Sequence, residues 1–269
     1  MKIEFIIVGV MKSGTTTLAN YLFLHPQIAI PECEVGYFAN DKYQKGKEWY
    51  ESFISKYITP QTKIAGEKTP YSYLSYTAER IYQYNPEMKL IWILRNPVDR
   101  AYSNYTNDLF NIDEWRSFEE CIKRENKRSY HNRYLEKGKY FAQITTFLQY
   151  FKKEQMHFII FEEFINNLQQ ELDKISEFLK VEKINFSSGK QIEEKKSYSP
   201  KYNPAILFFY RKLLGNKGKI WDYLWKINFE NRTKKKMNKK IREVLIEYYI
   251  PYNKMLESLL NKDLSFWNK

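Results

Sequence analysis

The chain is poor in the residues that build disulfide frameworks and metal centres. Its 269 residues include only two cysteines, Cys33 and Cys121, and three histidines. Two cysteines so far apart form neither a disulfide framework nor a zinc-binding spacing, so we interpret both as buried free thiols in a reducing compartment. The scattered histidines cannot supply a His-rich metal site. We therefore expect no metal requirement.

The sequence also lacks internal repeats, Gly/Ser linkers and an apolar segment long enough for a membrane anchor. The N-terminal stretch MKIEFIIVGV holds a short apolar run interrupted by Glu4, which is wrongly flanked for a signal peptide. We expect a cytoplasmic protein without a membrane partner. Hydrophobic residues make up 43% of the chain, enough for a real core. Without a visible boundary, we expect one domain over residues 1–269.

Acidic residues are fewer than basic ones. The chain has 32 Asp and Glu against 44 Lys and Arg, a net charge of +12. This balance predicts an anionic partner, which charge alone does not identify. Residues 196–240 are rich in aromatic and basic side chains, and we interpret them as an amphipathic cap that packs on the rest of the fold. No nucleic-acid-binding module is recognisable, so we expect no nucleic-acid partner.

Apolar runs of strand length alternate with helical patterns along the chain. This alternation is typical of an α/β fold with a central parallel sheet flanked by helices. We expect strands at residues 4–8, 63–67, 89–94 and 157–161. We expect helices at about residues 15–25, 77–85, 97–110, 140–151, 168–179 and 239–260. His25 lies before Pro26, which predicts a packed residue at a helix end rather than a catalyst.

The stretch GVMKSGTTTLANYL, residues 9–22, leads from an apolar strand through a glycine-punctuated turn into a helix. It nearly fits the nucleotide triphosphate loop G-x-x-x-x-G-K-[ST]. Thr15 stands where that loop has lysine, and the lysine of this chain lies earlier, at Lys12. Backbone N–H groups at the helix start, with the hydroxyls of Ser13, Thr15 and Thr16, can still hold an anion. The stretch therefore predicts a phosphate-binding loop.

A second motif, LIWILRNPVDRAYSNYTND, predicts a further anion site. A buried strand ends in Arg95, Asn96 is suited to cap a helix, Pro97 suits its first position, and Ser103 follows on that helix. Ligands of open α/β sheets lie beyond the carboxyl ends of the strands, where Arg95 stands. A magnesium-dependent nucleotidase needs an aspartate here, whereas a guanidinium grips phosphate directly. Together the motifs predict a nucleotide with phosphates at both ends of its ribose.

These motifs resemble those of sulfotransferases that use 3′-phosphoadenosine 5′-phosphosulfate (PAPS), most of all the heparan-sulfate-type and bacterial members. GVMKSGTTTL is similar to the 5′-phosphosulfate loop of that family, and LRNPVDRAYSNY to its 3′-phosphate motif. The resemblance continues through ECEVGYF, GEKTPYSYL, KGKYFAQITTFLQYF and YYIPYNKMLESLLNKDLSFW, so it covers nearly the whole chain. It implies a single-domain α/β fold with a P-loop-like 5′-phosphosulfate loop, PAPS as donor and 3′-phosphoadenosine 5′-phosphate (PAP) as product.

The resemblance also implies roles for individual residues. Lys12 would contact the bridging oxygen of the transferred sulfate, and Lys68 in GEKTP would lie near the reacting centre. The residues implied in donor binding are Lys12, Ser13, Gly14, Thr15, Thr16 and Thr17 at the 5′ end, Arg95 and Ser103 at the 3′-phosphate, and Asn231 and Arg232 in a basic loop that closes over the nucleotide. Residues 196–240 would then cap the donor and acceptor cleft.

Glu34 in PECEVGYF matches the glutamate that heparan-sulfate-type relatives use to deprotonate the acceptor, and we take it as the general base. Glu32 projects to the same side of an extended chain and is the alternative base. A surface carboxylate or a structural ion-pair partner is the other interpretation of Glu34. Glu67 is interpreted as an ion-pair partner that orients Lys68.

The acceptor side of the motif departs from the family pattern. Many saccharide-modifying relatives have histidine two residues after the glutamate, whereas this chain has Gly36 followed by Tyr37. We therefore expect a hydroxyl or amine of a small natural product as acceptor, with a saccharide as the alternative. An ATP-dependent kinase-like P-loop protein and a basic protein that binds anionic polymers are further alternatives. The sequence predicts no oligomeric state.

Overall fold

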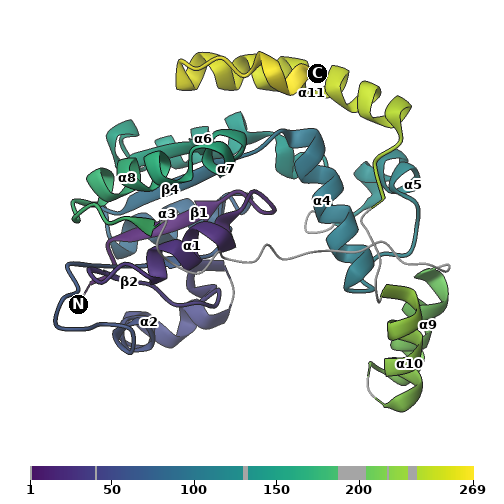
Figure 1. Cartoon of the computed structure of the whole chain (residues 1–269), viewed down its shortest axis with the longest axis horizontal. Helices are drawn as coiled ribbons and strands as arrows, with labels where there is room; N and C mark the ends of the chain where they lie inside the picture. The colour runs from purple at the N-terminus through teal and green to yellow at the C-terminus, as the bar shows by residue number, and fades with distance from the viewer. Residues whose placement is uncertain (1, 40, 130–132, 187–203, 217, 230–234) are drawn as a thin grey trace. The chain divides into compact units, whose positions relative to one another are not determined.

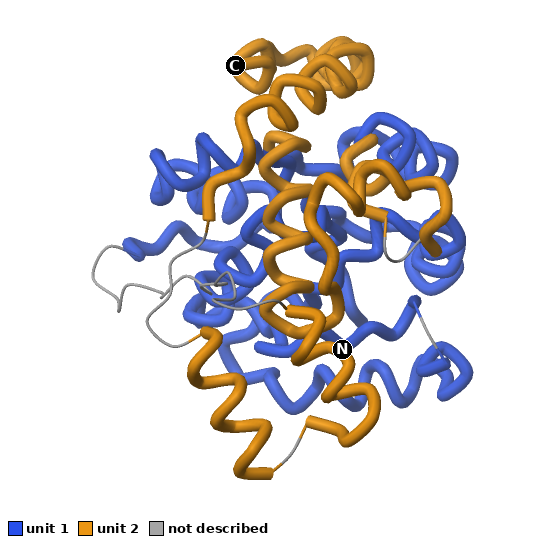
Figure 2. Tube along the Cα trace, turned by 90° about the vertical axis from the view of Figure 1, so that its right-hand side faces the viewer, with its two compact units in different colours: residues 1–95, 140–194 blue, residues 96–139, 195–269 orange. Residues whose placement is uncertain are grey.

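The computed structural model describes residues 2–39, 41–129, 133–186, 204–216, 218–229 and 235–269. The chain divides into two compact units, shown in different colours in Figure 2. Unit 1 comprises residues 1–95 and 140–194, and unit 2 comprises residues 96–139 and 195–269. The expected single domain over residues 1–269 stays a prediction.

The described part of unit 1 contains a five-stranded parallel sheet with the strand order β2-β3-β1-β4-β5 (Figure 1). The strands are β1 (Phe5–Gly9), β2 (Ile28–Ala29), β3 (Ile64–Lys68), β4 (Lys89–Leu94) and β5 (Met156–Ile160). The sequences FIIVG and KLIWIL are almost uniformly apolar and almost fully buried, as strands covered on both faces require. The predicted α/β fold is confirmed, and each expected strand lies within one residue of an observed one.

The strand order places the functional loops of unit 1 at one edge of the sheet. Strands β3 and β2 lie on one side of β1 in the sheet, and strands β4 and β5 lie on the other side. Such a reversal of strand order opens a crevice beyond the carboxyl ends of the strands, where ligands bind. Ile7 of β1 lies opposite Lys68 of β3 and Ile91 of β4, so at this edge β1 continues two residues and β4 three residues beyond the end of β3.

Helices cover both faces of this sheet. The helices of unit 1 are α1 (Thr15–Phe23), α2 (Gly46–Ser55), α3 (Tyr76–Tyr84), α6 (Tyr140–Leu148), α7 (Phe161–Asn166) and α8 (Leu168–Leu179), with 3₁₀ turns η1 (Tyr37–Ala39), η2 (Asp41–Lys45) and η6 (Lys153–Gln155). On one face, Leu18 of α1 and Ile175 of α8 join the core around Ile7. On the other face, Phe147 of α6 packs edge-on against Trp92 of β4 at 5.1 Å between ring centroids.

Two helices of unit 1 end earlier than expected. Helix α1 stops at Phe23 rather than at residue 25, and α6 stops at Leu148 rather than at residue 151. His25 lies just beyond α1, is 1% exposed, and its Nε2 lies 2.8 Å from the carbonyl oxygen of Glu182. The interpretation of His25 as a packed helix-end residue is therefore confirmed.

The described part of unit 2 is helical. Its helices are α4 (Pro97–Phe110), α5 (Phe118–Lys123), α9 (Pro204–Leu214), α10 (Lys219–Phe229) and α11 (Lys239–Leu260), with 3₁₀ turns η3 (Glu125–Lys127), η5 (Glu136–Gly138) and η8 (Ser265–Asn268). Asn96 caps α4 by accepting hydrogen bonds from the backbone N–H groups of Val98 at 3.0 Å and Asp99 at 3.4 Å. The predicted cap and the bounds of α4 are both confirmed.

The aromatic and basic segment over residues 196–240 forms α9 and α10 within the described residues. The two helices pack on the end of α4 through a small core of Ile112, Leu207 and Phe229. Residues 187–203 and 230–234 lie outside the described residues. The interpretation of this segment as a cap over the donor and acceptor cleft stays a prediction.

The two cysteines differ in burial. Cys121 is buried in unit 2, whereas Cys33 is exposed in unit 1. The expectation that both thiols are buried is wrong for Cys33, because it lies with Glu32 and Glu34 in a short exposed stretch between the buried Pro31 and Val35. Among the described residues, no helix combines the length and apolar character needed to cross a bilayer.

Candidate active site

The loop between β1 and α1 has a backbone shape that suits an anion. Lys12 and Gly14 both have positive φ angles, 68° and 88°. A Cβ atom on Gly14 would lie 2.9 Å from Cε2 of Phe161, so both the backbone angle and the close ring require glycine there. Left-handed residues in a turn direct successive N–H groups toward one side, which makes a concave anion site.

The start of α1 leaves polar groups available to such an anion. No side chain of the described residues caps the first turn of α1, and the turn carries no acidic residue. Its N–H groups therefore face outward at the positive end of the helix dipole. Ser13 is fully buried, and its Oγ has no hydrogen-bond partner among the described residues, which is rare for a buried hydroxyl. Thr15 is buried, and Thr16 and Thr17 are half-buried. The loop fits a phosphate ester.

Arg95 contacts this loop directly. Its Nη1 donates a hydrogen bond to the carbonyl oxygen of Lys12 at 3.0 Å. Its Cζ lies 4.6 Å from the ring centroid of Phe161, and Tyr140 Oη donates to the Arg95 carbonyl oxygen at 2.8 Å. The two motifs that the sequence presents separately therefore meet in unit 1. Sequence reasoning missed Phe161 and Tyr140, although Tyr140 lies within the motif KGKYF.

The other residues expected at the 3′-phosphate are not all placed. Ser103 is buried on α4 of unit 2, whereas Arg95 belongs to unit 1. Asn231 and Arg232 lie outside the described residues. The joint role of these residues stays a prediction.

Lys68 links the loop to the candidate base. The side chain of Lys68 is 4% exposed, and that of Glu34 is 49% exposed. Lys68 Nζ donates to Glu34 Oε1 at 3.1 Å and to Thr16 Oγ1 at 3.3 Å. The structure thus brings together Glu34 and Lys68, two of the three residues expected at the reacting centre, and Glu34 does form an ion pair. Glu32 is exposed.

Glu67 does not pair with Lys68, so the interpretation of Glu67 as the residue that orients this lysine is wrong. The two are neighbours on β3, and successive strand residues point to opposite faces. Glu67 is fully buried and accepts hydrogen bonds from the hydroxyls of Tyr50 at 2.8 Å, Thr69 at 2.8 Å and Tyr71 at 2.9 Å. Burial raises the pKa of the Glu67 carboxyl, and the hydroxyl hydrogen bonds oppose that rise.

The hydroxyls around Glu67 also hold the backbone that follows Glu34. Thr69 Oγ1 accepts a hydrogen bond from the N–H of Gly36 at 3.1 Å, and Tyr71 Oη accepts one from the N–H of Phe38 at 3.2 Å. Gly36 itself has a φ of 69°, which glycine adopts without strain. Sequence reasoning did not link Thr69 and Tyr71 to this backbone, although both lie in the motif GEKTPYSYL.

The described residues contain no group of three or more His, Cys, Asp or Glu side chains that could hold a metal ion. The candidate site therefore consists of the loop between β1 and α1, which we call the anion loop, together with Arg95 and the Lys68–Glu34 pair. Its main features are positive charge and hydrogen-bond donors. Such a set binds anionic groups directly.

Comparison with known proteins agrees with this geometry. Residues 2–249 match the family model of the sulfotransferase domain. The chain belongs to the sulfotransferase family. The predicted membership is thereby confirmed.

Curated relatives of this sulfotransferase include heparan sulfate enzymes. The chain is 33% identical over 184 residues to human heparan sulfate glucosamine 3-O-sulfotransferase 5, covering 65% of this chain and 53% of the relative. It is 26% identical over 287 residues to the Drosophila melanogaster bifunctional heparan sulfate N-deacetylase/N-sulfotransferase, covering 96% of this chain and 26% of the relative. The chain thus spans about half the length of the 3-O-sulfotransferase.

Solved structures show the same fold. A sulfotransferase from Alicyclobacillus acidocaldarius aligns over 100% of both chains with a TM-score of 0.73 and 26% identity. The sulfotransferase domain from the curacin biosynthetic pathway aligns over 98% of this chain and 99% of its own with a TM-score of 0.54. At 14% identity, the second comparison shows the fold alone.

Proposed function

We propose that this sulfotransferase transfers the sulfuryl group of PAPS to a hydroxyl or amine of a small natural product by in-line displacement. The observation that carries the proposal is the double contact of Lys68 Nζ with Glu34 Oε1 and Thr16 Oγ1. One buried ammonium group thereby connects the anion loop to the carboxylate best placed to accept a proton. Membership of the sulfotransferase family supports the same reaction.

The residues of the loop fit the 5′ end of the donor. The open first turn of α1 suits phosphate oxygens, with Gly14, Thr15, Thr16 and Thr17 beside it. The hydroxyl of Ser13, which has no hydrogen-bond partner among the described residues, suits them as well. When bound, PAPS supplies the sulfuryl group and leaves as PAP. Arg95 and Ser103, which share one continuous motif, are proposed to hold the 3′-phosphate, and Asn231 and Arg232 to close over the nucleotide.

Three side chains carry the proposed chemistry. Lys12 presents a compact positive charge that neutralises the charge developing on the leaving phosphate oxygen. Glu34 removes the proton of the acceptor as general base. Lys68 holds the Glu34 carboxylate beside the loop, so that the acceptor is deprotonated where the sulfuryl group is presented. The proposal requires no metal ion.

The acceptor is proposed from the surroundings of Glu34. Gly36 supplies no side chain there, and its N–H is already bound to Thr69. The absence of an imidazole at this position supports a small natural product as acceptor. We also propose a cytoplasmic enzyme without nucleic-acid or membrane partners. A saccharide is the second candidate acceptor, which the heparan sulfate relatives favour.

The reaction is tested by incubating the chain with PAPS and a panel of small hydroxylated metabolites, amines and oligosaccharides. A mass increase of one sulfuryl group in a small metabolite is expected, whereas an increase in oligosaccharides alone would select the second candidate. Thermal unfolding tests the donor separately, because a ligand that binds the folded state raises Tm. Stabilisation by ATP with magnesium, but not by PAP in EDTA, would contradict the proposal.

A further inference from the structure

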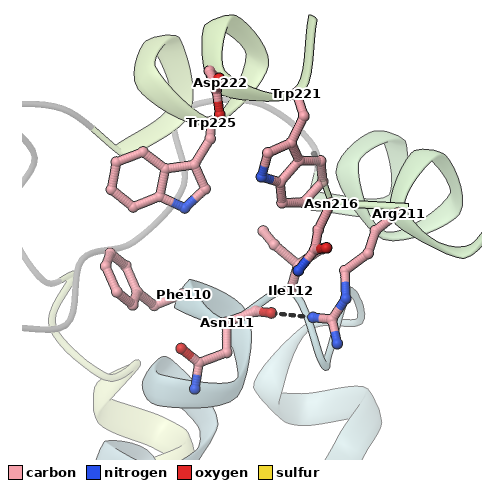
Figure 3. Close-up of a pocket in the computed structure, with 8 residues that line it drawn as sticks. All are labelled: Phe110, Asn111, Ile112, Arg211, Asn216, Trp221, Asp222 and Trp225. Atoms are coloured by element: carbon pink, nitrogen blue, oxygen red, sulfur yellow. Dashed lines mark hydrogen bonds between the residues drawn. The ribbon is translucent and has the colours of Figure 1, made fainter. Parts of the chain in front are cut away.

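Residues 34–38, which we call the base segment, carry the candidate base Glu34 and line neither of two pockets in the described structure. Figure 3 shows the first pocket, of about 330 Å³, which lies in unit 2 and whose Arg211 donates to the carbonyl oxygen of Asn111. The second, of about 610 Å³, lies at the ends of α1 and α2 in unit 1. The base segment is held instead by side chains that are packed around Glu67.

Hydroxyl groups from the chain after β3 hold the backbone of the base segment. Thr69 Oγ1 accepts a hydrogen bond from the N–H of Gly36 at 3.1 Å, and Tyr71 Oη accepts one from the N–H of Phe38 at 3.2 Å. Both hydrogen bonds are buried, so each N–H group would be left without a partner if its hydroxyl were removed. The backbone is therefore fixed two and four residues after Glu34.

The residue between these two, Tyr37, is held through its ring. The rings of Tyr37 and Tyr50 are stacked at 4.4 Å between centroids, with 5° between their planes. Tyr37 is 3% exposed, and Tyr50 is fully buried on α2. The hydroxyl of Tyr50 donates a hydrogen bond to Glu67 Oε1 at 2.8 Å. Three successive residues of the base segment are thus each held by a side chain that donates to Glu67.

The carboxylate of Glu67 sets the direction of all three hydroxyls. Tyr50 and Tyr71 donate to Oε1 and Thr69 donates to Oε2, at distances of 2.8–2.9 Å. A hydroxyl has a single hydrogen, so one that donates to Glu67 presents only lone pairs to any other group. Thr69 and Tyr71 use these lone pairs for the N–H groups of the base segment. A carboxylate accepts with both oxygens, whereas an amide would leave at least one of the three hydroxyl hydrogens without its acceptor.

We propose that Glu67 is a positioning residue for sulfuryl transfer, whose carboxylate orients the hydroxyls that fix the base segment and thereby places Glu34. Glu67 acts through Thr69 and Tyr71 and does not touch the reacting atoms. The inference rests on the proposed role of Glu34 as general base. A general base must stay within hydrogen-bond reach of the proton that it removes. A displaced base segment therefore slows the transfer step, while the anion loop, which is not part of this network, keeps its affinity for the donor.

The first test measures amide hydrogen exchange of the base segment in the full chain, without PAPS or acceptor. We expect Glu67→Gln to raise exchange of the Gly36 and Phe38 amides at least about tenfold, because the hydroxyls that accept from them lose their fixed orientation. With the acceptor that the panel identifies, kcat should fall about 10- to 100-fold. The Tm shift caused by PAP should stay as in the wild type. Unchanged exchange in a folded Glu67→Gln variant overturns the proposal.

Two tyrosines provide a matched pair of variants. Tyr50→Phe and Tyr71→Phe each remove one hydroxyl that donates to Glu67 Oε1, but only the Tyr71 hydroxyl accepts a hydrogen bond from the base segment. Tyr71→Phe should raise exchange of the Phe38 amide about tenfold and lower kcat. Tyr50→Phe keeps the ring that stacks on Tyr37, so it should lower Tm while exchange and kcat stay close to the wild type. Equal exchange and equal kcat in the two variants is the result of a merely structural network and overturns the proposal.

Thr69 supplies a test that keeps the Glu67 side chain. Thr69→Val removes the hydroxyl with little change of shape, whereas Thr69→Ser keeps it. We expect faster exchange of the Gly36 amide and a lower kcat in Thr69→Val alone. This pair decides if Glu67→Gln does not fold, and equal behaviour of the two variants overturns the proposal. Full activity in Glu34→Gln would overturn the proposed base, and the exchange rates, which need no turnover, would still show whether Glu67 fixes the segment.

Discussion

Arg95 Nη1 donates a hydrogen bond of 3.0 Å to the carbonyl oxygen of Lys12, across a sequence separation of 83 residues. The contact joins the ends of two neighbouring strands, β1 and β4, and fixes a guanidinium beside the anion loop. Because this hydrogen bond is accepted by a backbone carbonyl oxygen, the contact holds the shape of the loop independently of the Lys12 side chain. Arg95 therefore has two proposed tasks, to brace the loop and to bind the 3′-phosphate.

Replacing Arg95 tests both tasks. We expect Arg95→Ala to raise the donor KM by about 10- to 100-fold, since a charge-assisted contact is lost. Arg95→Lys should recover only part of this loss, because an ammonium group cannot reproduce the planar contacts with the loop and Phe161. Steady-state kinetics with varied PAPS and the Tm shift caused by PAP measure the effect. An unchanged PAP-induced shift in Arg95→Ala counts against the assignment, and the exposed Arg124→Ala is the control.

Replacing Lys12 separates catalysis from loop structure. Lys12→Ala should lower kcat by about 10²- to 10³-fold, because the leaving oxygen loses its positive partner. The backbone hydrogen bond from Arg95 remains in this variant, so Tm should change little. Lys12→Gly is the companion variant, since glycine accepts the φ of 68° without strain. Recovery of activity in Lys12→Gly would show that backbone shape, and not the ammonium group, governs turnover.

Replacing Glu34 tests the general base. Glu34→Gln should lower kcat by about 10²- to 10⁴-fold, because the amide cannot accept the proton of the acceptor. Rates are measured under single-turnover conditions, so that product release does not mask the chemical step.

The nearby Glu32 is the matched control for this variant. Glu32→Gln should retain activity close to the wild type. A purely structural role for the ion pair with Lys68 predicts instead a lower Tm in Glu34→Gln with little change in kcat. Loss of turnover in Glu32→Gln alone would transfer the role of base to that residue.

The buried Glu67 carboxyl should make stability depend on pH. Its pKa is raised by burial above the ordinary value of 4.5, so the folded state holds the proton more tightly than the unfolded state. The stability of the wild type relative to Glu67→Gln should therefore fall as the pH rises from about 4.5 through the raised pKa. Urea unfolding at several pH values measures this difference.

The exposed Glu87→Gln provides the reference for this experiment, and its stability should follow that of the wild type at every pH. The contrary result is a difference in the free energy of unfolding between the wild type and Glu67→Gln that is the same at every pH. That result would show that the Glu67 carboxyl does not titrate with a raised pKa in the folded state.

The helices and strands predicted best are those whose ends are determined by residues close together in the sequence. Helix α4 was predicted with both its ends, because Asn96 and Pro97 define its start through local hydrogen bonding and a fixed φ angle. Helix α2 was missed, and α1 was predicted too long. Cys33 was expected to be buried and is exposed. Its exposure depends on how the segment after β2 packs, which no local pattern reports.

The sequence alone determined the strand–turn–helix of the anion loop, the apolar strands and the family to which the chain belongs, because each depends on residues close together in the chain. Only the tertiary structure decided the partners of the charged groups. It placed Arg95 on the carbonyl of Lys12, Lys68 between Glu34 and Thr16, and Glu67 among three hydroxyls. These pairings arise from strand order and from the opposite faces of β3, where burial decides which polar groups must satisfy one another.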